Sequence, residues 1–175
     1  MHKHGKFFGR VNITLLVLVV ALSGCRMTVS LTGGNIDPRA KTVYVQTFTN
    51  NSSLVNPTLS QEFTTALKNR IQNQTPLTII NNGTGDYSLE GEITNYTITP
   101  VAIQGNETAA MNRLTISVRV RFSNSFDDTQ DFDQSFSRYA DYSSNQNFTS
   151  VESTLVNEIN DALTEDIFNK AFVNW

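Results

Sequence analysis

The feature that most constrains the fold is a strict alternation of apolar and polar residues over residues 113–123. Side chains that alternate with a period of two project to opposite faces of a β-strand, so this segment predicts a strand with one buried and one hydrated face. The residues expected on the buried face are Leu114, Ile116, Val118, Val120 and Phe122. Such a strand needs neighbours in a sheet and a layer that covers its apolar side, which leaves the polar side open.

A turn and a second apolar series follow this strand. Asp127 and Asp128 mark an acidic turn, and the large residues after it are Phe132, Phe136 and Tyr142. This pattern predicts a returning strand that pairs with the first in a long antiparallel hairpin. Residues 101–112, which precede the strand at 113–123, are expected to form a loop.

Three further segments favour extended structure. Tyr87, Leu89 and Ile93 alternate with polar residues, but Tyr96 has the opposite parity, so a bulge or bend is expected near Asn95. The run over residues 42–48 predicts the first strand, with Val43 and Val45 on one face and Tyr44 and Phe48 on the other. A shorter run covers residues 77–80.

Two segments show helical spacing instead. Leu59, Phe63, Leu67 and Ile71 recur every four residues after Pro57, and the chain turns again at residues 74–76. A second, longer amphipathic series ends near residues 172–175 and consists of Val151, Leu155, Ile159, Leu163 and Ile167. Thr58 with Gln61, and Thr149 with Glu152, have the spacing of capping boxes at the two helix starts.

The order of these elements, β-α-β-β-β-α, predicts an α+β domain over residues 42–175. Its two helices would pack on one face of a mainly antiparallel four-stranded sheet, because each amphipathic helix must cover an apolar surface. The other face of the sheet would be left uncovered by the helices and open to a different contact.

The N-terminus has the features of a signal peptide. Lys3, Lys6 and Arg10 precede a mostly apolar stretch over residues 11–21, which is shorter than the roughly 20 residues that a membrane-spanning helix needs. The sequence Leu22-Ser23-Gly24-Cys25 resembles the lipobox of bacterial signal peptidase II. We therefore expect cleavage of residues 1–24, lipidation of Cys25, and a flexible tether over residues 25–41. The alternative is an ordinary secretory peptide with a chance cysteine.

Cleavage would remove both histidines, His2 and His4, and lipidation would occupy the one cysteine. Disulfides, Cys-His or Ser-His-Asp catalysis, and His/Cys metal sites are then excluded for the mature chain, and no cofactor is expected. Three of the 13 basic residues lie in residues 1–24 and all 16 acidic residues lie beyond them, which leaves 10 basic residues and a formal charge of −6. A nucleic-acid partner is not expected at this charge.

Several short motifs resemble the lipopolysaccharide-assembly lipoprotein (LptE) family in its Bacteroidetes form. They run in the family's order along nearly the whole mature chain: residues 43–50 (VYVQTFTN), 57–60 (PTLS), 85–87 (GDY), 91–96 (GEITNY), 113–118 (RLTISV) and 174–175 (NW). The resemblance implies a non-enzymatic lipoprotein on the inner leaflet of the outer membrane, facing the periplasm. It also implies a two-helix, four-stranded domain that plugs the β-barrel LptD and helps lipopolysaccharide reach the cell surface.

Four arginines are candidate contacts for lipopolysaccharide or a protein partner. Arg113, Arg119 and Arg121 would project from one face of one strand, and Arg138 from the strand beside it could join them in binding lipid A phosphates. The alternative is a solvated strand face. The acidic residues around Asp128 lack the spacing of a calcium loop and are interpreted as a solvated turn, so no metal site is predicted.

The sequence leaves two other functional classes open besides lipopolysaccharide assembly. Periplasmic lipoproteins that bind and activate peptidoglycan synthases can combine a small domain of this order with a lipid tether. A hydrolase could use Glu90 and Glu92, which share a strand face, but both are expected to face water, where nothing would raise their pKa values. Arg26 after the cysteine is not the aspartate associated with retention in the inner membrane, which favours the outer membrane.

Overall fold

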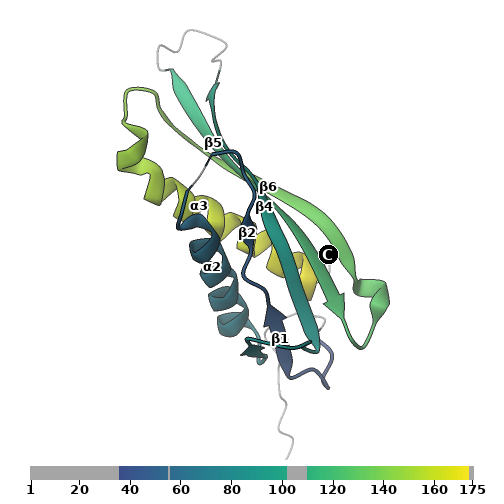
Figure 1. Ribbon diagram of the computed structural model, residues 1–175. Coiled ribbons are helices and arrows are strands. Elements are labelled where there is room, and N and C mark those ends of the chain that lie inside the picture. The colour runs from purple at the N-terminus through teal and green to yellow at the C-terminus, as the bar shows by residue number, and fades with distance from the viewer. Residues whose placement is uncertain (1–35, 55, 102–109, 174–175) are drawn as a thin grey trace, which may run out of the picture. The chain divides into compact units, whose positions relative to one another are not determined.

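The computed structural model describes residues 36–54, 56–101 and 110–173 (Figure 1). The predicted signal peptide, Cys25 and the first part of the tether lie outside these residues. The strands are β1 (Thr42–Val45), β2 (Thr49–Asn50), β3 (Thr78–Ile80), β4 (Tyr87–Val101), β5 (Met111–Asn124) and β6 (Phe132–Ser143). The helices are α2 (Leu59–Gln74) and α3 (Phe148–Phe168), with a short 3-10 turn η1 (Asp128–Gln130) and a π-helical turn η2 (Asn169–Val173).

The strands form one mixed sheet rather than the predicted four-stranded, mainly antiparallel one. Its order is β3-β1-β4-β5-β6, and β2 pairs with β4 beside this path. The β5–β6 hairpin is antiparallel as predicted and β4 also runs antiparallel to β5, but β1 runs parallel to both β3 and β4. The crossover through α2 returns the chain to the end of the sheet where β1 began, so β3 runs parallel to β1, and residues 81–86 return the chain to that end again before β4. Strands as short as β2 and β3 are too brief to produce a clear alternation.

The predicted irregularity in the third segment is confirmed. The register between β4 and β5 shifts between Ile93 and Asn95, which leaves Thr94 as the extra residue of a bulge. Leu89 and Ile93 before the bulge and Tyr96 after it are therefore all buried on the same side of the sheet.

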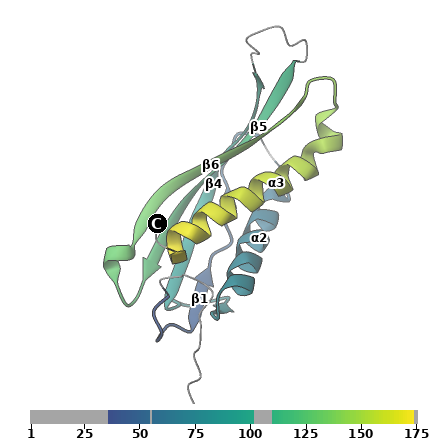
Figure 2. The ribbon, with the colours of Figure 1, turned by 180° about the vertical axis from the view of Figure 1, so that it is seen from behind.

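Both helices cover one face of the sheet, as predicted (Figure 2). Leu59, Phe63, Leu67 and Ile71 of α2 are fully buried, as are the inward residues of β5. The core also includes Phe48, which was predicted to face away from Val43 and Val45. This prediction was wrong because β1 ends at Val45, so the alternation stops and the chain turns Phe48 inward against Phe63, with 5.0 Å between the ring centroids.

Both predicted capping boxes were also wrong. The Asn56 side-chain oxygen accepts hydrogen bonds from the backbone N–H groups of Thr58 and Leu59 at the start of α2, each at 3.0 Å. Asn147 caps α3 in the same way through the Thr149 N–H, at 3.0 Å. An asparagine just upstream therefore satisfies the free backbone donors in each case.

Candidate functional site

The open face of the sheet carries polar side chains on every long strand. Its members on β4 and β5 include Glu90, Glu92, Arg113, Ser117, Arg119 and Arg121, and those on β6 are Asp133, Ser135, Ser137, Tyr139 and Asp141. We call this surface the polar face. It is the side that α2 and α3 leave uncovered, as the alternation in β5 predicted.

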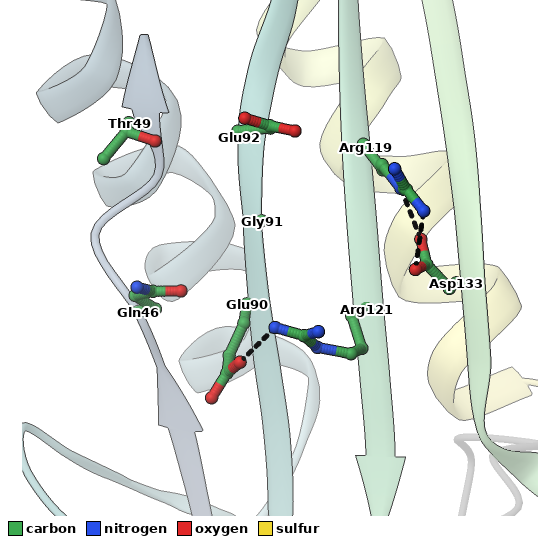
Figure 3. Close-up of a pocket in the computed structure, with 8 residues that line it drawn as sticks. All are labelled: Gln46, Thr49, Glu90, Gly91, Glu92, Arg119, Arg121 and Asp133. Atoms are coloured by element: carbon green, nitrogen blue, oxygen red, sulfur yellow. Dashed lines mark hydrogen bonds and ion pairs between the residues drawn. The ribbon is translucent and has the colours of Figure 1, made fainter. Parts of the chain in front are cut away.

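A hollow of about 310 Å³ lies on the polar face over the middle of β4 (Figure 3). Gly91 forms its floor, and its walls come from the segment after β1 and from β4, β5 and β6. The residues around it are Gln46, Thr49, Glu90, Glu92, Arg119, Arg121 and Asp133. Both guanidinium groups in the hollow are bound by carboxylates, so the surface is ionic but nearly balanced in charge.

Arg119 and Arg121 differ in how firmly they are held. Arg119 makes a two-point ion pair with Asp133, in which Nε and Nη2 donate to the two carboxylate oxygens at 2.8 and 2.9 Å. The guanidinium holds the pKa of Asp133 below its usual range. Arg121 donates only through Nη2, to Glu90 at 2.8 Å, so its other N–H groups face the hollow without a bond to the described chain.

Arg113 lies further along the same face. Its Nε and Nη2 donate to Asp141 at 2.7 and 2.8 Å, and the centre of its guanidinium lies 3.6 Å from the Tyr139 ring centroid. The Tyr139 side of this stack is open, because Tyr139 is 55% exposed. The pKa of Asp141 is lowered by its hydrogen bonds to Arg113.

Arg138 does not join the other three arginines. It pairs with Ile116 in the β5–β6 register and lies on the helix side of the sheet, where it forms a two-point ion pair with Asp166 of α3 at 2.6 and 2.7 Å. The sequence carried a signal for this placement, because Arg138 has the same parity as Phe136 and Tyr142. The polar face therefore brings together Arg113, Arg119 and Arg121 only.

The carboxylates that pair with the arginines were missed at the sequence level. Asp133 and Asp141 alternate with the apolar residues of β6, which signals that they lie on the polar face. Their arginine partners depend on the strand register, which the alternation does not determine.

The other acidic residues singled out in the sequence also have defined partners. Glu92 accepts a hydrogen bond from Asn51 at 2.5 Å. Asp127 caps η1 by accepting from the Thr129 N–H at 3.1 Å, and Asp131 accepts from the Asn124 N–H at 2.7 Å. No group of His, Cys, Asp or Glu among the described residues is arranged to hold a metal ion. Within the same residues, no helix is long and apolar enough to cross a bilayer.

Comparison with known proteins gives one family and a set of distant folds. The family model described as "LptE: Lipopolysaccharide-assembly" matches residues 40–171. The fold is similar to a minor lipoprotein from Acinetobacter baumannii, with a TM-score of 0.51 and 14% identity over 75% of this chain and 91% of that one. It is also similar to a putative neuraminyllactose-binding hemagglutinin homolog from Helicobacter pylori, with a TM-score of 0.53 and 8% identity over 80% and 87% of the two chains. No curated protein matches the sequence.

Proposed function

Because the chain belongs to the lipopolysaccharide-assembly (LptE) family, we propose that it acts with an LptD-like β-barrel to transport and assemble lipopolysaccharide at the outer membrane. The observation that carries this proposal is the family match over residues 40–171, which spans the sheet and both helices. The proposed mechanism is occupancy: the domain fills or braces the barrel, and it performs no chemical step.

The polar face supports this mechanism. The lumen of an outer-membrane barrel is polar, so a protein inside it must offer hydrogen-bonding side chains rather than an apolar surface. The hydroxyl groups of Ser117 and Ser137 hydrogen-bond each other at 2.9 Å across β5 and β6, between the flanking arginine–aspartate pairs. This row presents many donors and acceptors at nearly balanced charge, which suits a wet interface with a polar wall.

Direct contact with lipopolysaccharide is a second part of the proposal. Arg119 and Arg121 are the best placed to bind a phosphate, since both line the hollow and Arg121 retains free donors. Arg113 is a weaker candidate because Asp141 and Tyr139 engage it, and Arg138 would need a ligand on the helix side. Photocrosslinking from position 119 in living cells tests this contact. Crosslinks to lipopolysaccharide support it, and crosslinks to protein alone contradict it.

The barrel partnership is tested by affinity capture of the lipidated protein from detergent-solubilised outer membrane. We expect an LptD-like barrel in the captured material. Capture of a penicillin-binding protein would favour the peptidoglycan-synthase alternative, and capture of neither would contradict the proposal. A variant with Arg119→Glu and Arg121→Glu tests the surface involved. It should weaken capture, because the polar face is the surface proposed to contact the barrel.

We also propose that Cys25 carries the lipid and that the protein faces the periplasm from the outer membrane. A lipidated cysteine stays on a membrane because each buried methylene contributes about 0.8 kcal/mol. Cys25→Ser should release or mislocalise the protein while leaving the circular dichroism spectrum of residues 42–173 unchanged. Retention of the variant in the outer-membrane fraction would contradict this assignment.

A catalytic role for Glu90 and Glu92 is not part of the proposal. Glu90 is bound by Arg121 and Glu92 by Asn51, so neither is poised beside a reacting group in the hollow. A double alanine variant should therefore keep lipopolysaccharide assembly intact. Loss of assembly with normal folding, normal barrel capture and undiminished crosslinking to lipopolysaccharide from position 119 would argue for chemistry at these carboxylates.

A further inference from the structure

An uncharged stretch crosses the middle of the polar face. Cross-strand partners share a face of the sheet, so two neighbouring rows of side chains from β4, β5 and β6 lie side by side here. None of their six side chains carries a charge, and five of them carry a hydroxyl. We call this surface the hydroxyl stretch, and its members are Asn95, Thr97, Thr115, Ser117, Ser137 and Tyr139.

Ion pairs bound the hydroxyl stretch at both ends. Arg113 pairs with Asp141 at one end, and Arg119 pairs with Asp133 at the other. Both are two-point pairs, so these four charges are already neutralised within the chain. The two arginines lie six residues apart on β5, which corresponds to roughly 20 Å along the strand. A ligand that lies between them meets hydroxyl and amide groups and no unpaired charge.

Tyr139 adds an aromatic surface to this stretch. At 55% exposure, it is the only exposed aromatic side chain among the described residues. The Arg113 guanidinium covers one face of the ring, with its centre 3.6 Å from the ring centroid, and Asp141 holds the guanidinium in place. The other ring face is open. Because the ring is already held in position, it loses little conformational freedom when a ligand stacks on it.

A sugar ring matches this combination of groups. One side of a pyranose consists of C–H groups, which stack on an aromatic face, and its hydroxyls each donate one hydrogen bond and accept up to two. The hydroxyls of Ser117 and Ser137 hydrogen-bond each other at 2.9 Å, and the Asn95 amide donates to the Thr97 hydroxyl at 3.2 Å. Each of these groups keeps further donor or acceptor capacity for the hydroxyls of a sugar.

We propose that the hydroxyl stretch binds uncharged sugars of the lipopolysaccharide oligosaccharide, with one sugar ring stacked on the open face of Tyr139. Lipopolysaccharide as the source of the sugars rests on the proposed function. The inference deepens that function, because it gives the sugar part of the molecule a place separate from the hollow, where Arg121 retains donors for a phosphate. A sugar bound here lies in the wet interface between the polar face and the barrel wall.

Other occupants fit the hydroxyl stretch less well. An apolar side chain of a partner would cover the Tyr139 ring, but it would also bury the hydroxyls of Thr115 and Ser137 without bonding them, which is unfavourable. A charged segment would find the arginines and aspartates at both ends already paired. The charges of the surface therefore favour a neutral ligand rich in hydroxyls.

Three substitutions separate the ring from the hydroxyl groups. Tyr139→Ala removes the aromatic surface, whereas Tyr139→Phe keeps it. Thr115→Val removes one hydroxyl at nearly constant shape. Gln134→Ala is the matched control, because Gln134 is exposed on the opposite face of β6, in register with the buried Val120.

The test uses the lipidated full chain in a zwitterionic detergent, because a sugar-based detergent would compete for the site. The probe is the oligosaccharide of the native cell's lipopolysaccharide, freed of lipid and phosphate, and its binding is followed by NMR. The amide signals of Thr115, Ser137 and Tyr139 should shift on titration, while that of Gln134 should not.

The affinities of the variants give the second readout. Affinity should fall about fivefold in Tyr139→Ala, as expected for the loss of one aromatic stack, and stay within about twofold in Tyr139→Phe. Thr115→Val should weaken binding about threefold through the lost hydrogen bond, and Gln134→Ala should leave it unchanged.

The absence of any shift along the hydroxyl stretch would overturn the proposal, and so would equal binding by Tyr139→Ala. Tighter binding of a peptidoglycan glycan fragment than of the oligosaccharide would overturn the assigned source. If the oligosaccharide does not bind and Tyr139→Ala weakens capture of the barrel instead, the occupant is the barrel wall. The wild-type shifts decide the matter even if a variant fails to fold. Capture of the barrel by the wild-type protein tests the proposed function separately, so the two proposals fail independently.

Discussion

The Tyr96 hydroxyl donates a hydrogen bond of 2.6 Å to the Glu152 carboxylate, and this contact joins the sheet to the N-terminal part of α3. The same carboxylate oxygen accepts a hydrogen bond of 2.7 Å from Asn56, the residue that caps α2. One carboxylate therefore fastens both helix starts to β4. Burial, followed by the bond to Glu152, raises the pKa of Tyr96, so the hydroxyl stays protonated as the donor.

Removal of this donor should destabilise the fold measurably. Tyr96→Phe keeps the buried ring but loses a hydrogen bond to a charged group, which typically costs about 1–3 kcal/mol of the free energy of unfolding. Urea denaturation followed by circular dichroism measures the loss. Ser135→Phe, an exposed change of the same final residue type, is the control. Equal stability of Tyr96→Phe and the wild type would show that the contact contributes nothing.

Gly91 should tolerate no side chain. An added Cβ would lie 2.1 Å from the Arg119 backbone oxygen and 2.7 Å from a ring carbon of Phe48, so the strand or the ring would have to move. Overpacking of this kind costs about 1–3 kcal/mol, and we expect Gly91→Ala to lie at or above the top of that range. Gly83→Asn is the control: Gly83 has φ +84° and open space around it, a conformation that asparagine accepts. Similar melting temperatures for the two variants would contradict the close contact.

Asn160 should be replaceable by an apolar residue with a gain in stability. It is 2% exposed in α3, and neither its side-chain nitrogen nor its oxygen has a hydrogen-bond partner in the described chain. A buried polar group left unpaired costs about 1–3 kcal/mol, so Asn160→Leu, which keeps the branched skeleton but replaces the amide by two bulkier methyl groups, should raise the free energy of unfolding by roughly 1 kcal/mol. Asn157→Leu on the exposed side of α3 is the control. Destabilisation by Asn160→Leu would show that the amide has a partner, such as a buried water.

Acid should weaken the fold through carboxylates with lowered pKa values. Asp86 accepts hydrogen bonds from the Lys41 and Thr42 backbone N–H groups and from the Thr42 hydroxyl, and these lower its pKa. The pKa values of Asp133 and Asp141 are lowered by their hydrogen bonds to Arg119 and Arg113, respectively. A group with a lower pKa in the folded state binds fewer protons there than in the unfolded chain, where the pKa is about 3.9. Its contribution is therefore complete above about pH 4 and is lost as the pH falls through the folded value.

Urea unfolding at several pH values measures this effect. The free energy of unfolding should be nearly constant between about pH 5 and 7 and should decline below about pH 4. In Asp86→Asn, which cannot titrate, the decline should be shallower and the stability at neutral pH lower. A free energy that rises on acidification, or an identical slope in the variant, would contradict the role of Asp86.

The regular parts of the fold were predictable because a single periodicity dominates each of them. β5 and α3 bury one uninterrupted face, and the bulge in β4 appears as a change of parity in the sequence itself. Phe48 escaped prediction because the alternation stops where β1 ends, at Val45, and because Gly91 on β4 leaves the space that the Phe48 ring fills. The helix N-caps were predicted wrongly because Asn56 and Asn147 compete with the nearby threonines for the same backbone donors.

For the candidate site, the sequence predicted which side chains share a face of the sheet but not which of them pair. The alternation in β5 places Arg113, Arg119 and Arg121 together, but a slip of two residues between strands would keep every side chain on the same face and change each charge partner. The pairing of Arg119 with Asp133 is therefore a property of the register, which the hairpin's turn sets. Arg138 was assigned to the wrong face although its parity with Phe136 indicated the helix side.

Depletion of the protein in its native cell is the sharpest test of its proposed role in lipopolysaccharide assembly. Surface lipopolysaccharide is measured by labelling intact cells while expression is shut off. We expect surface lipopolysaccharide to fall as the protein disappears, and the wild-type gene to restore it whereas Cys25→Ser does not. An unchanged amount of surface lipopolysaccharide after complete depletion would contradict the proposed role.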